Sequence, residues 1–197
     1  MYNRGIKRSL DFILSLSGLI VLSPVFGILT LWIKLDSPGP VYFRQKRCAK
    51  DGEFFEIYKF RTMRSDTPKD VPTHLLNDPE QFITRSGRFM RRTSLDELPQ
   101  LINILKGEMS VIGPRPALWN QDDLMKLRKE NGSASLRPGL TGWAQIHGRD
   151  ELPIKTKADL DGYYASNIGF LMDVRCFIGT IVPVIKQQGI QEGKTAE

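Results

Sequence analysis

Two adjacent carboxylates, Asp96 and Glu97, form the pair of side chains best suited to acid, base or nucleophilic chemistry. They follow two arginines, the first of which is Arg91, and apolar residues then recur at the spacing of a helix with one buried face. We therefore predict a helix from about residue 96 to 106, with both acids in its first turn. The simplest role for them there is capping, either by a capping box of Ser94 and Glu97 or by Asp96 itself.

A rigid arginine further along the chain suggests a second role for the acids. Arg115 lies between Pro114 and Pro116, which stiffen the backbone and favour an extended conformation. A guanidinium fixed in this way suits a phosphate group, which it can bind through two parallel hydrogen bonds. Two acids, a divalent metal ion and fixed cations are the components of a phosphoryl-transfer site.

Two further cations, Lys59 and Arg61, come at the end of the second of two β-rich segments. The segments, 41–43 and 54–60, are joined through residues 50–52, whose sequence Lys-Asp-Gly predicts a hairpin turn. A spacing of two residues places both cations on one face of a strand. That face is either a solvated strand edge or, beside a carboxylate site, a clamp for phosphate groups.

An uncharged apolar segment runs from Phe12 to Ile33. At about 1.5 Å per residue it is long enough to cross a hydrocarbon core. Pro24, after Ser23, interrupts it and leaves the carbonyl near Ile20 in need of a partner, for which the Ser23 hydroxyl is a candidate. Basic residues flank both ends, which favours both ends on one side of a membrane. The residues alone support a re-entrant and a spanning helix about equally, and a cleaved signal peptide less.

Composition limits the partners of the chain. Its 197 residues are enough for one domain with a real core, and its net charge of +6 at pH 7 indicates anionic partners such as phosphates, nucleic acid or an acidic membrane surface. Cys48 and Cys176 provide neither a disulfide framework nor the spacing of metal ligands. Near the C-terminus, residues 168–185 predict an amphipathic helix that either faces the core or lies on a membrane.

Five motifs extend along nearly the whole chain: Asp36-Ser-Pro-Gly-Pro-Val, Tyr58-Lys-Phe-Arg-Thr-Met, Thr93-Ser-Leu-Asp-Glu-Leu-Pro-Gln, Lys106-Gly-Glu-Met-Ser-Val-Ile-Gly-Pro-Arg-Pro and Arg137-Pro-Gly-Leu-Thr-Gly-Trp-Ala-Gln. Their sequences and order resemble the bacterial sugar transferase family. Its members are the monotopic phosphoglycosyl transferases that begin glycan assembly on a polyprenol carrier. The chain departs from the family pattern at Ala49, where glycine is usual, and at His147, where asparagine is more frequent.

The expected fold class is α+β, mainly helical with a small β-hairpin. The resemblance implies a monotopic membrane protein whose N-terminal re-entrant helix is broken at Ser23-Pro24. We expect residues 1–35 to form the anchor and residues 36–197 the catalytic domain, as one folding unit. By the same resemblance, the domain lies on the cytoplasmic face of the bacterial inner membrane.

The resemblance also implies a reaction. A phosphosugar passes from a UDP-sugar to a polyprenol (undecaprenyl) phosphate, with release of UMP. Asp96 is the expected nucleophile and Glu97 its partner, with Mg²⁺ bound near both carboxylates. Four basic residues are expected to bind the phosphates: Lys59, Arg61, Arg91 and Arg115.

A non-catalytic membrane scaffold of a glycan assembly complex is the alternative. It explains the positive charge and the apolar segment, but gives no reason for an acid pair near a proline-flanked arginine. Nucleic-acid binding has less support, because the sequence contains no recognised nucleic-acid module. The remaining expected partner is membrane phospholipid. The identity of the sugar and the formation of homo-oligomers stay open.

Overall fold

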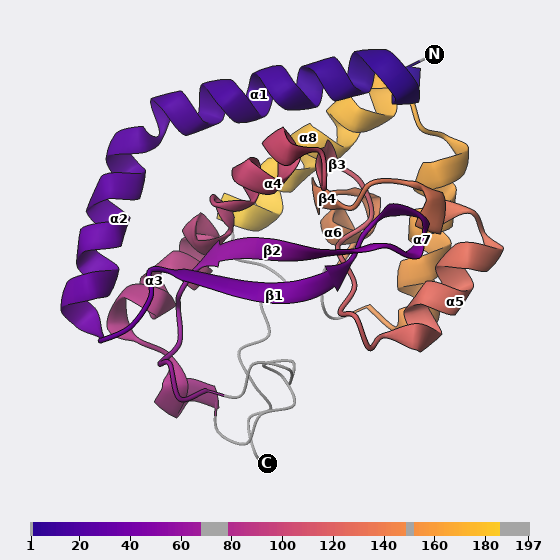
Figure 1. The fold of residues 1–197 in the computed structure, drawn as a ribbon. Helices are drawn as coiled ribbons and strands as arrows, with labels where there is room; N and C mark the ends of the chain where they lie inside the picture. Colours follow the sequence, from indigo (N-terminus) through magenta and orange to yellow (C-terminus); the bar gives the residue numbers. More distant parts are fainter. Residues whose placement is uncertain (1, 68–78, 149–151, 186–197) are drawn as a thin grey trace.

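The computed structural model describes residues 2–67, 79–148 and 152–185, and its fold is α+β and mainly helical, as predicted (Figure 1). The helices are α1 (Lys7–Val21), α2 (Ser23–Asp36), α3 (Arg85–Thr93), α4 (Gln100–Lys106), α5 (Asp122–Glu130), α6 (Trp143–Ile146), α7 (Ile154–Ser166) and α8 (Phe170–Ile185). The strands are β1 (Tyr42–Cys48), β2 (Phe54–Phe60), β3 (Ser110–Ile112) and β4 (Gly139–Thr141). A π-helical turn (Tyr2–Ile6) precedes α1, and 3₁₀ turns cover Lys50–Gly52, Pro79–Phe82, Leu95–Glu97 and Ser133–Ser135.

The predicted β-hairpin is confirmed. Strands β1 and β2 pair antiparallel, from Tyr42 opposite Phe60 to Cys48 opposite Phe54. A second pair was not predicted: β3 and β4 are parallel, with Ser110 opposite Gly139 and Ile112 opposite Thr141. Each of these strands has three residues, too few for an alternating pattern to be visible in the sequence.

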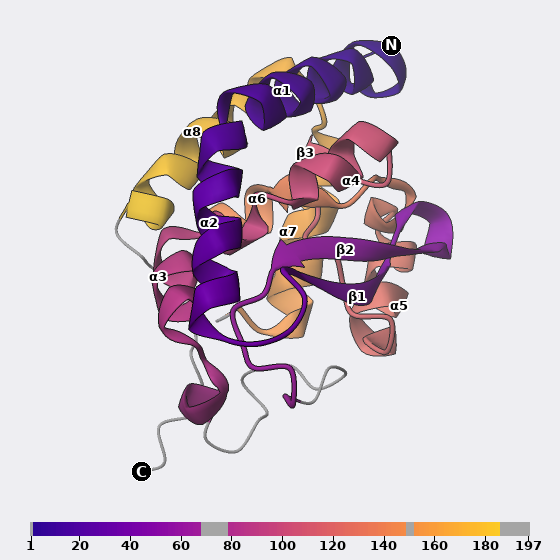
Figure 2. The ribbon, with the colours of Figure 1, turned by 60° about the vertical axis from the view of Figure 1, so that its left-hand side comes forward.

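The apolar N-terminal segment forms two helices bent by 61° between Val21 and Ser23. The Ser23 hydroxyl donates to the carbonyl of Ile20 over 2.8 Å, the bond predicted from the proline-induced gap. In the described part of the chain no single helix has the length and apolarity to cross a membrane, whereas α1 and α2 reach both limits together. Figures 1 and 2 show α1 and α2 as two arms that enclose one corner of the molecule.

Apolar side chains pack α1 and α2 against the elements on either side of the acids, which are β2, α3 and α4. Leu29 and Ile33 of α2 pack with Phe60 of the hairpin and Met90 of α3. Leu19 of α1 and Leu22 at the bend pack against a second cluster. This cluster lies between β2 and α4 and contains Phe55, Ile57, Leu101, Ile104 and Met109. The hairpin, α3 and α4 therefore form one packed unit with the bent pair, and this unit fixes the position of the acids.

Candidate active site

Asp96 and Glu97 lie in the 3₁₀ turn between α3 and α4. The predicted helix start near residue 96 and the predicted capping box are therefore wrong, because α4 begins at Gln100 and Ser94 makes no side-chain capping bond in the described structure. Pro99, which has no N–H to donate, occupies the N-cap position instead of an interior one. Neither acid therefore occupies the N-cap position of α4.

Ser94 forms the sharp connection between α3 and the turn that holds the acids. Its φ is 56°, in the left-handed region that residues other than glycine seldom adopt. Such conformations cost free energy and are kept where surrounding packing enforces them, often at functional sites. In the next residues the chain presents Asp96 in a buried position, with only 9% of its surface exposed.

Two basic side chains converge on the acids from distant parts of the chain. Lys59, near the end of β2, places its Nζ 2.7 Å from Glu97 Oε1 and 3.9 Å from Asp96 Oδ2. Arg115 places Nη2 3.1 Å from the same Glu97 oxygen. These contacts join four of the six residues named from the sequence as site residues.

The two carboxyls differ in their affinity for a proton. Burial raises the pKa of Asp96 to about 6, against the opposing charge of Lys59, and the charge of Glu97 adds to the increase. Glu97 is also buried to a degree, but the charges and hydrogen bonds of Lys59 and Arg115 outweigh this and lower its pKa well below the usual range. Asp96 is thus the more basic carboxylate of the pair.

The last two predicted site residues lie in different surroundings. Arg91, on α3, donates through Nε to the Thr62 hydroxyl at 3.2 Å, and its charge favours ionisation of Asp96. Arg61 follows the last residue of β2 and is buried, and its guanidinium donates to the carbonyls of Ser37 and Pro38. The structure thus brings Arg91 near the acid pair but places the guanidinium of Arg61 against the turn that follows α2.

A divalent metal ion would have the two adjacent carboxylates as its protein ligands. Among the described residues no group of three or more histidine, cysteine, aspartate or glutamate side chains is placed to hold a metal. Mg²⁺ does not need one, because it commonly binds one or two carboxylates and completes its shell with water and substrate phosphates. The oxygen donors of Asp96 and Glu97 fit that requirement.

The loop that carries Arg115 is held by residues that the sequence analysis did not single out. The three successive carbonyls of residues 114–116 accept hydrogen bonds from the Gly139 N–H at 2.8 Å, Arg128 Nη1 at 2.9 Å and Arg47 Nη1 at 3.0 Å, respectively. The loop and β4 approach so closely that a Cβ on Gly139 would lie 2.1 Å from a backbone nitrogen of the loop segment. Only glycine fits at that position.

The chain is similar to known proteins over most of its length. Residues 2–187 match the model of a family described as bacterial sugar transferase. The exopolysaccharide production protein PSS of Rhizobium leguminosarum bv. phaseoli is 42% identical over 189 residues, which cover 90% of this chain and 94% of that protein.

Two longer relatives have names that state a reaction. The UDP-glucose:undecaprenyl-phosphate glucose-1-phosphate transferase of Escherichia coli (strain K12) is 44% identical over 149 residues, covering 74% of this chain but 32% of that protein. The undecaprenyl-phosphate galactose phosphotransferase of Salmonella typhimurium is 34% identical over 203 residues, covering 95% of this chain and 42% of that protein.

Proposed function

The chain belongs to the bacterial sugar transferase family, as its motifs predicted, and we propose that it transfers a phosphosugar from a UDP-sugar to undecaprenyl phosphate. The names of the Escherichia coli and Salmonella relatives support the acceptor, and the first of them also supports a UDP-sugar donor. The observation that carries the proposal is the buried carboxyl of Asp96 beside Glu97, with Lys59 and Arg115 directed at the pair.

In the first step an oxygen of the Asp96 carboxylate attacks the sugar-linked phosphorus of the donor. A bond forms between this oxygen and phosphorus, the bond from that phosphorus to the bridging oxygen breaks, and UMP leaves with the bond electrons. The product is an acyl phosphate that carries the sugar on Asp96. Covalent catalysis of this kind replaces one difficult encounter between two anionic substrates with two easier steps.

In the second step a phosphate oxygen of the lipid attacks the same phosphorus. The new bond makes polyprenol-diphospho-sugar, and the bond to Asp96 breaks and regenerates the carboxylate. Each half-reaction thus exchanges one phosphorus–oxygen bond for another, and one site serves first the soluble donor and then the lipid acceptor.

The different environments of the two acids support this division of labour. The Glu97 oxygen Oε1 already accepts from Lys59 and Arg115, and the low pKa of this carboxyl makes it a weak nucleophile. Asp96 has a pKa of about 6, so it is largely ionised at neutral pH and more basic than its neighbour. We therefore assign nucleophilic attack to Asp96.

The basic residues have separate roles in this proposal. Lys59, Arg91 and Arg115 neutralise the donor phosphates, as fixed cations do in phosphoryl transfer. Arg61 instead holds the turn that leaves α2, through the carbonyls of Ser37 and Pro38. Mg²⁺, held by Asp96 and Glu97, would supply further neutralisation of phosphate charge when bound.

Helix α1 buries polar side chains and exposes apolar ones, the opposite of a helix on the surface of a soluble protein. This arrangement supports a membrane location. Its buried face carries Lys7, Asp11 and Ser15. Lys7 pairs with Asp173 of α8, and Asp11 accepts from the hydroxyl of Ser110. The rest of the helix surface exposes large apolar side chains: Phe12, Ile13, Leu14, Leu16 and Ile20. A group of exposed large apolar side chains on one helix indicates contact with lipid or another protein.

Exposed apolar residues on two other helices extend this surface. Helix α2 exposes Ile28, Leu31 and Leu35, and α8 exposes Phe170, Leu171, Phe177, Ile178 and Ile181. Because Asp173 and Cys176 of α8 are buried, this helix has one face on the core and the other free for an interfacial position. We propose that the bent α1–α2 pair enters the cytoplasmic leaflet of the bacterial inner membrane and returns, with α8 lying on its surface.

This membrane path predicts that residues on either side of the bent pair lie on the same side of a membrane. Cysteines placed at the exposed positions Gly5, in the turn before α1, and Asp66, after β2, in separate variants, should both react with an impermeant maleimide from the cytoplasmic side of sealed vesicles. The parent chain is the control, because its two cysteines are buried and should stay unlabelled. Labelling of the two positions from opposite sides would mean that the segment spans the membrane.

The two proposed steps can be tested separately by supplying the UDP-sugar first and the lipid phosphate second. The purified protein, incubated with Mg²⁺ and a panel of UDP-sugars but no lipid, should gain the mass of one phosphosugar on the peptide containing Asp96. Addition of undecaprenyl phosphate should then remove that mass and release UMP in step with polyprenol-diphospho-sugar. The preferred donor is the one with the highest rate.

The scaffold alternative predicts a different result in the same assay. It requires neither UMP release nor an adduct with any sugar of the panel. Turnover without an adduct on Asp96 would keep the transferase assignment but rule out the covalent route.

A further inference from the structure

A buried ion pair far from the acids in sequence is linked to them through the loop that carries Arg115. We propose that Arg128 and Asp161 are positioning residues, which hold the backbone of this loop so that the Arg115 guanidinium meets Glu97. The proposal rests on the function proposed above, since it concerns the placement of a phosphate-binding cation.

The ion pair joins two helices in the interior. Arg128, on α5, is 4% exposed, and Asp161, on α7, is 1% exposed. Arg128 Nε and Nη2 donate to the same carboxylate oxygen of Asp161, over 2.9 and 2.6 Å. The third nitrogen of the planar guanidinium, Nη1, donates to the carbonyl of Arg115 over 2.9 Å. Asp161 therefore orients the guanidinium, and the guanidinium holds the loop.

The composition of the loop means that its carbonyl groups need hydrogen-bond donors from other parts of the chain. Pro114 and Pro116 have no backbone N–H groups, so these residues offer acceptors only. A carbonyl that is removed from water needs a donor from the protein, and each of the three carbonyls of residues 114–116 has one. Arg128 supplies the donor for the middle carbonyl, which belongs to the residue whose side chain acts in the site.

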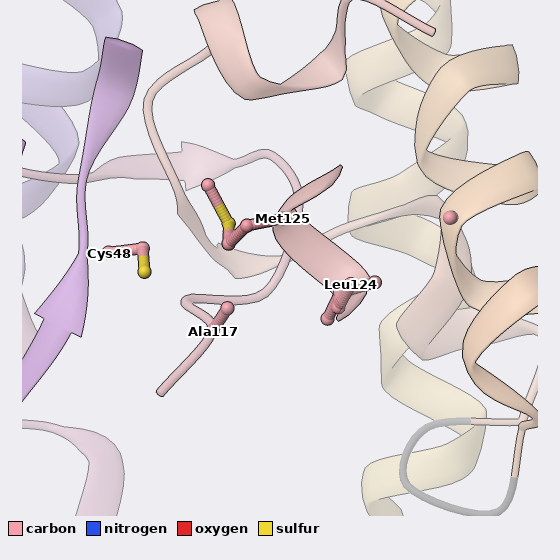
Figure 3. Close-up of a cluster of buried hydrophobic side chains, with 5 residues drawn as sticks. Cys48, Ala117, Leu124 and Met125 are labelled. Carbon is pink, nitrogen blue, oxygen red and sulfur yellow. The ribbon is translucent and has the colours of Figure 1, made fainter. Parts of the chain in front are cut away.

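Apolar packing fixes α5 against the end of the same loop. Figure 3 shows Ala117, two residues after Arg115, in a cluster with Leu124 and Met125 of α5, with Cys48 of β1 nearby. Arg128 follows Met125 by less than one helical turn, so the cluster determines how far its guanidinium lies from the loop. The distance of Arg115 Nη2 from Glu97, 3.1 Å, thus depends on contacts made on the far side of the loop.

The geometry demands arginine at position 128. A lysine keeps the charge and can reach Asp161, but it lacks the rigid fork that addresses a carboxylate and a carbonyl together. A displacement of a substrate-positioning group by about 1 Å can lower the rate by about 100-fold. We therefore expect Arg128→Lys to lower kcat/KM for the UDP-sugar by about 10- to 100-fold.

A double-mutant cycle separates positioning from a general structural effect. Arg115→Ala alone should lower kcat/KM by about 100-fold or more, because a fixed donor to the phosphates is lost. If Arg128 acts through Arg115, adding Arg128→Lys to Arg115→Ala should lower kcat/KM further by no more than about twofold. Asp161→Asn should show the same non-additivity, and it provides a second route if Arg128→Lys does not fold.

The matched control is Arg8→Lys, because Arg8 Nη1 and Nη2 also donate to backbone carbonyls, those of Ile104 and Leu105 on α4, away from the Arg115 loop. Its effect should multiply with that of Arg115→Ala. Full multiplication of the Arg128→Lys and Asp161→Asn effects with that of Arg115→Ala would overturn the positioning role. A parent protein that releases no UMP would instead refute the proposed function, so the two failures are distinguishable.

Discussion

Asp96→Asn should abolish sugar-phosphate transfer, with a loss of turnover on the order of 10⁴-fold or more, the size seen when a covalent nucleophile is removed. The amide keeps the size and one oxygen of the side chain but lacks a nucleophilic carboxylate. It also removes a negative charge from a buried site beside Glu97, so the fold should be at least as stable as that of the parent. The measurement is UMP release with Mg²⁺, the best UDP-sugar and undecaprenyl phosphate.

Two further observations make the Asp96→Asn result specific. Mass spectrometry without lipid should find no phosphosugar on the variant, although the parent carries it. Asp159→Asn is the matched control, because it makes the same chemical change at an exposed position of α7 and should retain parental turnover. If Asp96→Asn turned over at the parental rate, the proposed covalent mechanism would be wrong.

The bend of the N-terminal segment was predictable because its cause is local. Pro24 removes one backbone donor, and the hydroxyl of the preceding residue, Ser23, donates a hydrogen bond to the carbonyl of Ile20 instead. The hairpin was also predictable from its turn and two β-rich segments. The parallel β3–β4 pair was not, because its partners are short, lie far apart in sequence and are matched only by tertiary packing.

The site could be predicted in composition but only partly in geometry. The acids and Arg115 were identified from residue types, proline spacing and the family resemblance. Arg61 was grouped with Lys59 because alternate residues share a face, a rule that applies only while the strand continues. Strand β2 ends at Phe60, and the chain turns Arg61 towards the exit of α2.

Arg128 was missed although the sequence contains a signal for it. It follows Leu124 and Met125 at three- to four-residue spacing, so it falls on the buried face of α5. A charge on such a face needs a partner, because an unpaired buried charge is costly. The identity of that partner, Asp161, depends on how α5 and α7 pack, which the sequence alone does not specify.

The second large effect is expected from Glu97→Gln, with a loss of turnover of about 100- to 1,000-fold. Glutamine keeps an oxygen that can accept from Lys59 and Arg115, but it lacks the negative charge that draws both cations to this point. It is also a poorer ligand for Mg²⁺, so the Mg²⁺ concentration for half-maximal rate should rise. The nucleophile is retained, so a phosphosugar adduct should still accumulate slowly on Asp96, unlike in Asp96→Asn.

The control for this change is Glu56→Gln, which makes the same substitution at an exposed position of β2. It should leave the rate and the Mg²⁺ dependence at parental values. The proposed role of Glu97 requires both quantities to change, because this residue connects the cations and the metal ion to the nucleophile. A Glu97→Gln variant with parental Mg²⁺ dependence would show that metal binding does not involve this carboxylate, and parental turnover would remove Glu97 from the site altogether.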